Sequence, residues 1–138
     1  MGRKKEEKNL KTTKKTNKMS KSIVREKSKD FAVRIVHLYQ YLKETKKEFV
    51  MSKQLLRSGT SIGANLSEQK FAISDADYLS KTSIALKEGA ETIYWLELLF
   101  KTEYLTEKEY NAINNDCKEI VSMLVQSVKT NKERLNRV

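Results

Sequence analysis

The sequence predicts an all-α protein, an antiparallel up-and-down four-helix bundle, within a chain of 138 residues. Three observations predict it. Proline is absent and glycine occurs four times, apolar residues recur at three- and four-residue intervals in four segments, and short polar connections separate these segments. Proline and glycine interrupt helices and shape turns, so their scarcity argues against a turn-rich β fold. Short connections between helices make neighbouring helices antiparallel.

The first predicted helix covers residues 23–44. Its apolar side chains recur at spacings of seven, four, three and four residues, which place them on one face of an α-helix. They are Val24, Phe31, Ile35, Leu38 and Leu42. Burial of one such face per helix forms the core of a bundle.

The second predicted helix covers residues 52–72, with Ser52 as the expected N-cap and Met51 packed on Leu56. Gly59 and Gly63 lie inside it, and a glycine there costs about 1 kcal/mol relative to alanine. We therefore expect small side chains to let another backbone come close. The residues assigned to packing or to an interface, here and on the third helix, are Ser58, Gly59, Ser61, Gly63, Asn65, Glu88 and Trp95.

The third predicted helix covers residues 75–101 and follows Ser74, a good N-cap with acids after it. One seam repeats every seven residues at Leu79, Leu86, Ile93 and Phe100, and a second contains Tyr78, Ala85, Gly89, Thr92 and Leu99. Glu88 and Glu91 lack the histidine that the Glu-x-x-His motif of di-iron bundles requires. We expect them to pair with Arg57 or Lys81, and Trp95 to be an anchor for packing.

The fourth predicted helix begins with a capping box from Thr106 to Glu109. Its apolar stripe comprises Tyr110, Ile113, Cys117, Ile120, Leu124 and Val128. Cys117 lies within the stripe, so we expect a small core residue rather than a nucleophile. The predicted bundle therefore spans residues 23–132, and residues 133–138 are expected to fray.

Positive charge is concentrated at the N-terminus. Residues 1–29 contain 12 basic and 3 acidic side chains, a net charge of +9, whereas the remaining 109 residues contain 16 and 15, a net charge of +1. Residues 1–22 have almost no apolar side chains, so we predict a disordered basic arm that binds RNA or DNA. The alternative is a solubilising tail. The side chains assigned to nucleic acid are Lys4, Lys5, Lys8, Lys11, Lys14, Lys15, Lys18, Lys21 and Arg25.

No catalytic residue, metal site or cofactor is predicted, and we expect the protein not to be an enzyme. His37 is the only histidine, and two residues separate it from Arg34. Small helical nucleases of the HEPN type have four to six residues between this arginine and histidine, so the spacing does not fit. No apolar run reaches the roughly 18 residues of a membrane span, and no signal peptide is evident, which predicts a cytoplasmic protein without a membrane partner.

Two long motifs carry a family resemblance. RSGTSIGANLSE at residues 57–68 and KTSIALKEGAETIYWL at residues 81–96 resemble the signatures of bacterial four-helix-bundle proteins encoded in intervening sequences of large-subunit ribosomal RNA genes. The resemblance covers roughly residues 31–128. This chain departs from the family pattern at Gln69, where alanine is usual, and at Gly89, where a larger residue is common.

The resemblance implies a ring-like homopentamer of bundles, similar to the accessory variability proteins of diversity-generating retroelements. Those relatives bind a reverse transcriptase and nucleic acid through a basic surface. We therefore predict a non-enzymatic homo-oligomer that binds RNA or DNA through its basic surface and N-terminal arm. The alternatives are an accessory subunit that binds a reverse transcriptase and, less favoured, a small helical ribonuclease.

Overall fold

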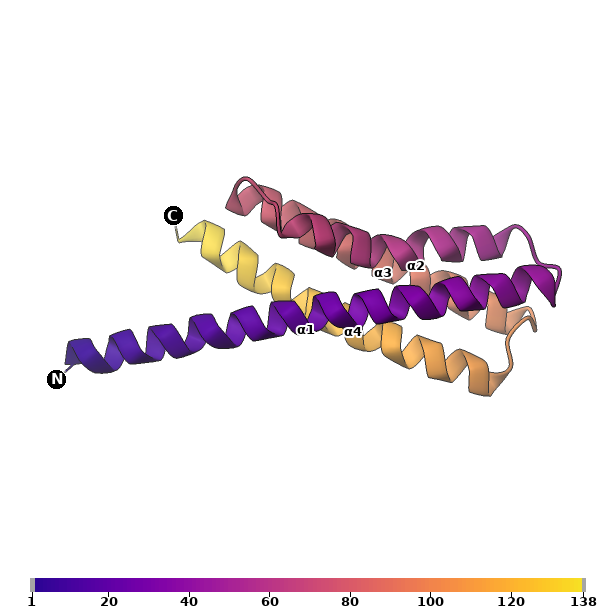
Figure 1. Cartoon of the computed structure of the whole chain (residues 1–138), viewed down its shortest axis with the longest axis horizontal. Coiled ribbons are helices and arrows are strands. Elements are labelled where there is room, and N and C mark those ends of the chain that lie inside the picture. The colour runs from indigo at the N-terminus through magenta and orange to yellow at the C-terminus, as the bar shows by residue number, and fades with distance from the viewer. Residues whose placement is uncertain (1, 138) are drawn as a thin grey trace.

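Four α-helices make up the structure, a computed structural model that describes the backbone of residues 2–137 and the side chains of residue 19 and residues 21–137. They are α1 (Gly2–Glu44), α2 (Met51–Gln69), α3 (Asp75–Lys101) and α4 (Glu107–Asn136), and residues 2–137 contain no strand. Each helix packs against the next, and α4 returns to α1 (Figure 1). The predicted all-α fold of four helices is therefore confirmed. Every helix between residues 2 and 137 is too polar along its length to be a membrane span.

The core lies along the middle of the four helices and is built from the predicted apolar stripes. Fully buried side chains come from every helix, and the largest are Ile35, Leu42, Leu55, Ile62, Leu66, Leu96, Leu99, Ile120 and Leu124. Helix α3 buries the seam that contains Ala85, Gly89 and Thr92, whereas Leu86 and Ile93 of the seven-residue repeat are only half-buried. The first half of α3 thus turns small residues toward the centre of the bundle, and Leu96 and Leu99 do so in its second half, whereas Leu86 and Ile93 lie at its flanks.

The glycines of α2 lie where α1 comes close. A Cβ atom at Gly63 would lie 3.3 Å from the backbone oxygen of Ser28, and one at Gly59 would lie 2.8 Å from the side chain of Ile35. A larger side chain at either position would therefore push α1 away. The conformational cost of glycine within α2 is offset by this close helix contact.

The connection between α1 and α2 corrects one prediction. Ser52 is not the N-cap of α2; the cap position is Val50, whose side chain forms no capping hydrogen bond. The carboxylate of Glu48 instead accepts hydrogen bonds from the backbone N–H groups of Val50 and Met51, both at 3.0 Å, and of Ser52, at 2.6 Å. The hydroxyl of Ser52 donates to the backbone oxygen of Glu48. The carboxylate of Glu48 therefore satisfies three amide groups at the start of α2, whereas a serine cap at position 52 would have accepted from an amide two or three residues after it.

The other two helix starts follow the sequence prediction. Ser74 accepts a hydrogen bond from the backbone N–H of Asp77 at the start of α3. Thr106 and Glu109 form the reciprocal pair of a capping box at the start of α4.

The ends of α1 and α4 lie beyond the predicted bundle. Helix α1 includes residues 2–22, and α4 reaches Asn136. That residues 1–22 form a disordered arm in solution and that residues 133–138 fray stay predictions. No proline interrupts either segment, lysine and glutamate favour helix, and adding residues to an existing helix costs little. Within the described side chains, Val24 is the first buried residue of α1. Helix α1 thus extends past the other helices at its N-terminus (Figure 1).

Candidate nucleic-acid interface

The predicted nucleic-acid residues divide into two groups. The side chains of Lys4, Lys5, Lys8, Lys11, Lys14, Lys15 and Lys18 lie outside the described residues. Lys21 and Arg25 are described and lie on α1 at the end of the bundle that also contains the α2–α3 connection and the C-terminus of α4 (Figure 1). We call this end the basic end.

A chain of hydrogen bonds connects all four helices at the basic end. Arg25 Nη2 of α1 donates to Gln69 Oε1 of α2 at 3.0 Å, and Gln69 Nε2 donates to Thr82 Oγ1 of α3 at 2.5 Å. Asn131 Nδ2 of α4 donates to the same hydroxyl at 3.4 Å. Gln69 and Thr82 are buried, so this network fixes the Arg25 guanidinium in place.

Further charged side chains surround this network. Arg134 of α4 lies 4.0 Å from the Asp75 carboxylate, and Lys21 Nζ lies 4.8 Å from the centre of the Tyr78 ring. Lys70, on the α2–α3 connection, lines the same region as Arg25. Four cations and the Asp75 carboxylate therefore line this part of the basic end, which also contains Asp77 and the Lys81–Glu68 ion pair.

Three hollows open between these side chains. A cleft of about 550 Å³ is lined by Arg25, Gln69, Lys70 and Tyr78 among others. A small cavity of about 60 Å³ adjoins it, and Lys21, Tyr78 and Arg134 line that cavity. Tyr78 thus borders both hollows.

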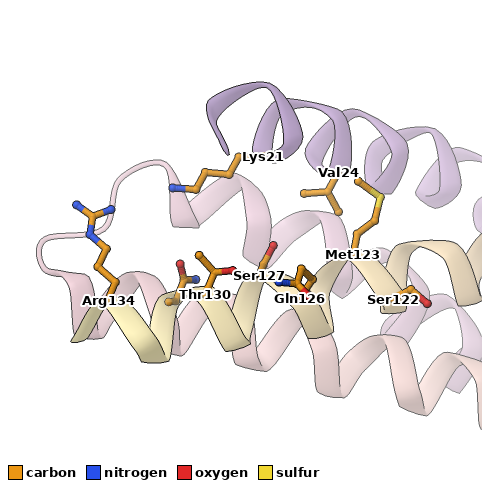
Figure 2. A pocket seen from close by; sticks show the side chains of 9 residues that line it. Lys21, Val24, Ser122, Met123, Gln126, Ser127, Thr130 and Arg134 are labelled. Atoms are coloured by element: carbon orange, nitrogen blue, oxygen red, sulfur yellow. Dashed lines mark hydrogen bonds between the residues drawn. The ribbon is translucent and has the colours of Figure 1, made fainter. Parts of the chain in front are cut away.

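The third hollow is a groove of about 470 Å³ between α1 and α4. Figure 2 shows Lys21 reaching from α1 and Arg134 from α4 toward the same end of this groove, with Val24 and Met123 farther along it. The groove therefore leads from an apolar middle to a cationic opening.

The electrostatics of the basic end reflect this excess of positive charge. Burial lowers the pKa of Lys21, and the nearby charges of Arg134 and Arg25 lower it further against the opposing effect of Asp75. Burial raises the pKa of Tyr78, although Arg25 and Arg134 oppose the rise. The cations at this end are thus only partly compensated by the acid among them.

Two polar atoms here are enclosed without a hydrogen bond of good geometry in the structure. They are Nε of Arg25 and the hydroxyl of Tyr78. Leaving such a group unsatisfied typically costs about 1–3 kcal/mol. The network therefore leaves donor capacity unused beside the clefts.

Among the predicted packing residues, Ser58, Gly59 and Gly63 lie at contacts between helices, and Trp95 packs partly buried against the core. Thr92 Oγ1 donates to the buried Ser58 Oγ at 3.0 Å, joining α3 to α2. Ser61 and Asn65 bond to backbone oxygens of their own helix. Trp95 Nε1 donates to Glu91 at 3.2 Å, and its ring meets Tyr94 edge-on. Whether these residues also form an interface between copies stays a prediction.

Within one copy of the chain, the predicted ion pairs of Glu88 and Glu91 are not formed among the described residues. Ion pairs of these residues between copies stay a prediction. Burial raises the pKa of Glu88, and the neighbouring Glu91 raises it further against the opposing effect of the nearby charge of Arg57. Lys81 pairs with Glu68 at 2.8 Å. The salt-bridge partner of Lys81 is thus on α2, where the helix ends.

The reactive residue types lie away from the basic end. Cys117 is fully buried in the core, where burial raises the pKa of its thiol to about 12. His37 is exposed on α1, and the neighbouring Arg34 forms an ion pair with Asp116 of α4. Among residues 19 and 21–137, no three His, Cys, Asp or Glu side chains gather as metal ligands would.

Sequence reasoning missed Gln69, Lys70, Tyr78 and Arg134. One signal was available for the buried part: Gln69 follows Leu66 by three residues, and Asn131 follows Val128 by three. At both places a polar residue takes the next position of an apolar stripe. A polar residue at an expected core position, at the same end of two helices, indicates a buried hydrogen-bond network.

Comparison with known proteins gave a family and a solved structure. A family model described as 23S rRNA-intervening sequence protein matches residues 8–126. A crystal structure from Bacteroides thetaiotaomicron VPI-5482, described as a protein with unknown function from the S23 ribosomal protein family, is 56% identical in sequence. That match covers 80% of this chain and 98% of the other, with a TM-score of 0.78. No curated protein matches the chain.

Proposed function

Since the chain belongs to the 23S rRNA-intervening sequence protein family, we propose that it is a non-enzymatic homo-oligomer that binds RNA or DNA through α1 and the basic end. One observation carries the proposal: a net charge of +9 on residues 1–29, most of it on a stretch of α1 that extends past the other helices (Figure 1). A phosphate backbone is the common polyanion that such a helix attracts.

The position of the charge supports this function more than its amount does. The bundle beyond residue 29 has a net charge of +1, so the electrostatic field is strongest along one helix. At its base, Lys21 and Arg25 continue this charge onto the folded end of the bundle, beside Arg134. A strand bound along α1 would therefore meet an ordered set of cations.

Homo-oligomerisation would add avidity, because several copies of α1 would act on one nucleic acid. Exposed apolar side chains support an interface between copies: Phe71 is 80% exposed, Ile73 is 92% exposed and Tyr94 is 57% exposed. Mass in solution, measured by light scattering over a range of concentrations, tests this part. A multiple of the 16.1 kDa chain mass supports it, and a monomer at all concentrations contradicts it.

The nucleic-acid part is tested by fluorescence anisotropy with labelled RNA and DNA strands at several salt concentrations. Replacement of seven N-terminal lysines by glutamine should weaken binding at least about tenfold at 0.1 M salt and flatten its salt dependence. These lysines are Lys4, Lys5, Lys8, Lys11, Lys14, Lys15 and Lys18.

A matched control removes the same charge from the rest of the chain. It replaces seven exposed lysines of the bundle: Lys43, Lys46, Lys53, Lys87, Lys108, Lys118 and Lys129. We expect this variant to bind more tightly than the N-terminal variant. Equal loss in both variants would show that only total charge matters, and wild-type binding that is independent of salt would contradict the proposal.

The role as an accessory subunit of a reverse transcriptase stays a prediction from resemblance. It requires a protein partner, and co-purification with such an enzyme would be the observation in its favour. The ribonuclease prediction is tested by incubating the protein with labelled RNA and comparing the His37→Ala variant.

A further inference from the structure

We propose that two adjoining hollows at the basic end, one lined by Arg25 and Lys70 and the other by Lys21 and Arg134, together form a binding site for a phosphate group. The inference deepens the proposed function, because it gives one phosphate of the bound strand a defined position. The phosphate would lie where the 550 Å³ cleft meets the small cavity, beside Tyr78.

Charge is the first argument. Four cations from α1, α4 and the α2–α3 connection line the two hollows, and Asp75 is the one acid that lines them. Mutual repulsion among Lys21, Arg25 and Arg134 contributes to the lowered pKa of Lys21. A bound phosphate would relieve this repulsion, because its charge is opposite and it can contact several cations at once.

Unused donors are the second argument. Arg25 Nε and the Tyr78 hydroxyl are enclosed atoms that form no hydrogen bond of good geometry, although Arg25 lies close enough to Tyr78 to lower its pKa through a side-chain hydrogen bond. Both side chains line the larger cleft. Phosphate oxygens accept hydrogen bonds and have none to donate when fully ionised. A phosphate that reached these groups would supply an acceptor for Arg25 Nε and place a negative charge beside the guanidinium.

Preorganisation is the third argument. Gln69 holds the Arg25 guanidinium at 3.0 Å and is itself held by the Thr82 hydroxyl, to which Asn131 also donates. Arg25 thus presents its remaining N–H groups without having to order its side chain on binding. A surface lysine on a flexible stem lacks this advantage.

Asp75 provides a test with the opposite sign, because its carboxylate lies 4.0 Å from Arg134 and would repel a phosphate. Removal of this one negative charge should tighten phosphate binding. We therefore expect Asp75→Asn to increase the affinity for phosphate roughly tenfold, the reverse of the effect of removing a cation. A role limited to stabilising the fold would not produce opposite effects on affinity.

The first experiment titrates inorganic phosphate into the isotope-labelled full-length protein, with chloride added to keep ionic strength constant. We expect NMR shifts at the Nε–H of Arg25 and at amides of residues 70–78. Arg134→Gln should weaken the interaction roughly tenfold, whereas Arg137→Gln, which removes the same group from a position outside the clefts, should leave it unchanged. Absence of shifts at these residues, or equal effects of the two arginine variants, would overturn the inference.

Tyr78→Phe separates binding from folding. It removes a hydroxyl that forms no hydrogen bond of good geometry in the free protein, so the variant should melt no lower than wild type and still bind phosphate more weakly. A lower melting temperature with unchanged phosphate affinity would assign the hydroxyl to stability and count against the site.

The second experiment identifies the source of the phosphate by comparing strands with and without a 5′-phosphate in the anisotropy assay. Weaker binding of both strands by Arg134→Gln assigns the site to a backbone phosphate, and weaker binding of the 5′-phosphorylated strand alone assigns it to a strand end. If the affinity for a strand depends on the N-terminal lysines but is unchanged by Arg134→Gln, the inference is overturned and the proposed function stands. Phosphate binding by a protein that binds no strand would overturn the proposed function and leave the phosphate site standing.

Discussion

Helix α1 makes two different contacts in the bundle, one with α2 and one with α4. Against α2 it comes close at Gly59 and Gly63, where a Cβ atom would lie 2.8–3.3 Å from atoms of α1. Against α4 it packs less closely, and ion pairs from Lys27 to Glu119 and from Arg34 to Asp116 join the two helices. The α1–α4 side also contains the 470 Å³ groove.

This difference shows how one helix can serve both stability and binding. Small side chains on the α2 side let backbones approach and exclude water, so contact there is fixed. Long charged side chains on the α4 side keep the helices apart and leave hollows that water or a ligand can enter. The candidate phosphate site lies at the end of the open side toward which Lys21 and Arg134 reach (Figure 2).

The largest expected effect is on the closed side. Gly63→Leu should overpack the contact with the backbone of Ser28 and lower the free energy of unfolding by about 1–3 kcal/mol. Chemical denaturation measures this loss. The mass of the variant in solution shows whether the substitution also disrupts assembly. Gly63→Ala serves as the graded control with a smaller loss. Equal stability of Gly63→Leu and wild type would contradict the close contact.

The next effect concerns Glu48, which caps α2 at the end of the closed side. Burial raises the pKa of Glu48, but hydrogen bonds from Met51, Ser52 and Val50 together outweigh this effect, so its pKa lies below the usual value. Glu48→Gln should therefore cost about 1–2 kcal/mol of unfolding free energy at pH 7.

The pH dependence of this cost has a defined sign. Because the folded-state pKa is the lower one, the contribution of the carboxylate is complete above the unfolded pKa of about 4.3 and is lost as the pH falls through the folded pKa. Stability curves of wild type and Glu48→Gln should converge at low pH. The exposed Glu133→Gln is the control, and curves that stay parallel down to low pH would contradict the role of Glu48.

A smaller effect is expected on the open side. Lys27 Nζ lies 2.9 Å from Glu119, but the two side chains are 42% and 55% exposed, so solvent screens the pair. Lys27→Gln should lower the free energy of unfolding by about 0.2–1 kcal/mol, less as salt increases. Lys29→Gln is the control on the same helix. A loss as large as that of Gly63→Leu would show that the two sides of α1 are held equally firmly.

The smallest expected effect is in the N-terminal part of α1, which precedes the first buried residue, Val24. Amide hydrogen exchange should be nearly unprotected in residues 2–20 and strongly protected from Phe31 to Leu42, because tertiary packing supplies most of the stability of a helix. Addition of a nucleic-acid strand should slow exchange in residues 2–20. Without a ligand, protection of these residues equal to that of Leu42 would contradict the expectation that tertiary packing protects only the later part of α1.

Much of the fold could be predicted from the sequence because local rules decide it. The apolar stripes of α1, α2 and α4, the bounds of α3 and the caps at Ser74 and Thr106 all follow from spacing and from side chains a few residues away. The cap of α2 was missed although it is equally local: Glu48 lies two to four residues before the three amide groups that donate to it, but glutamate is not among the usual capping residues.

The candidate site was only partly visible in the sequence. Lys21 and Arg25 were assigned by charge, whereas Lys70, Tyr78 and Arg134 lie up to 113 positions away from them in the chain. Gln69 is a departure from the family pattern that the structure explains, since it connects Arg25 to Thr82. Ion pairs were harder to predict, because more than one acid lies near Lys81, namely Glu68 and Asp77, and the ion pair forms with Glu68.

By itself, the sequence determined four helices, their order, the faces they bury and a strong excess of positive charge at one end of the chain. These properties depend on neighbours along the chain, within one or two helical turns. Tertiary structure alone decided that Arg25, Tyr78 and Arg134 surround common hollows, and that one side of α1 is closed while the other is open. Those properties depend on how backbones approach across the bundle, which the periodicity of any single helix does not specify.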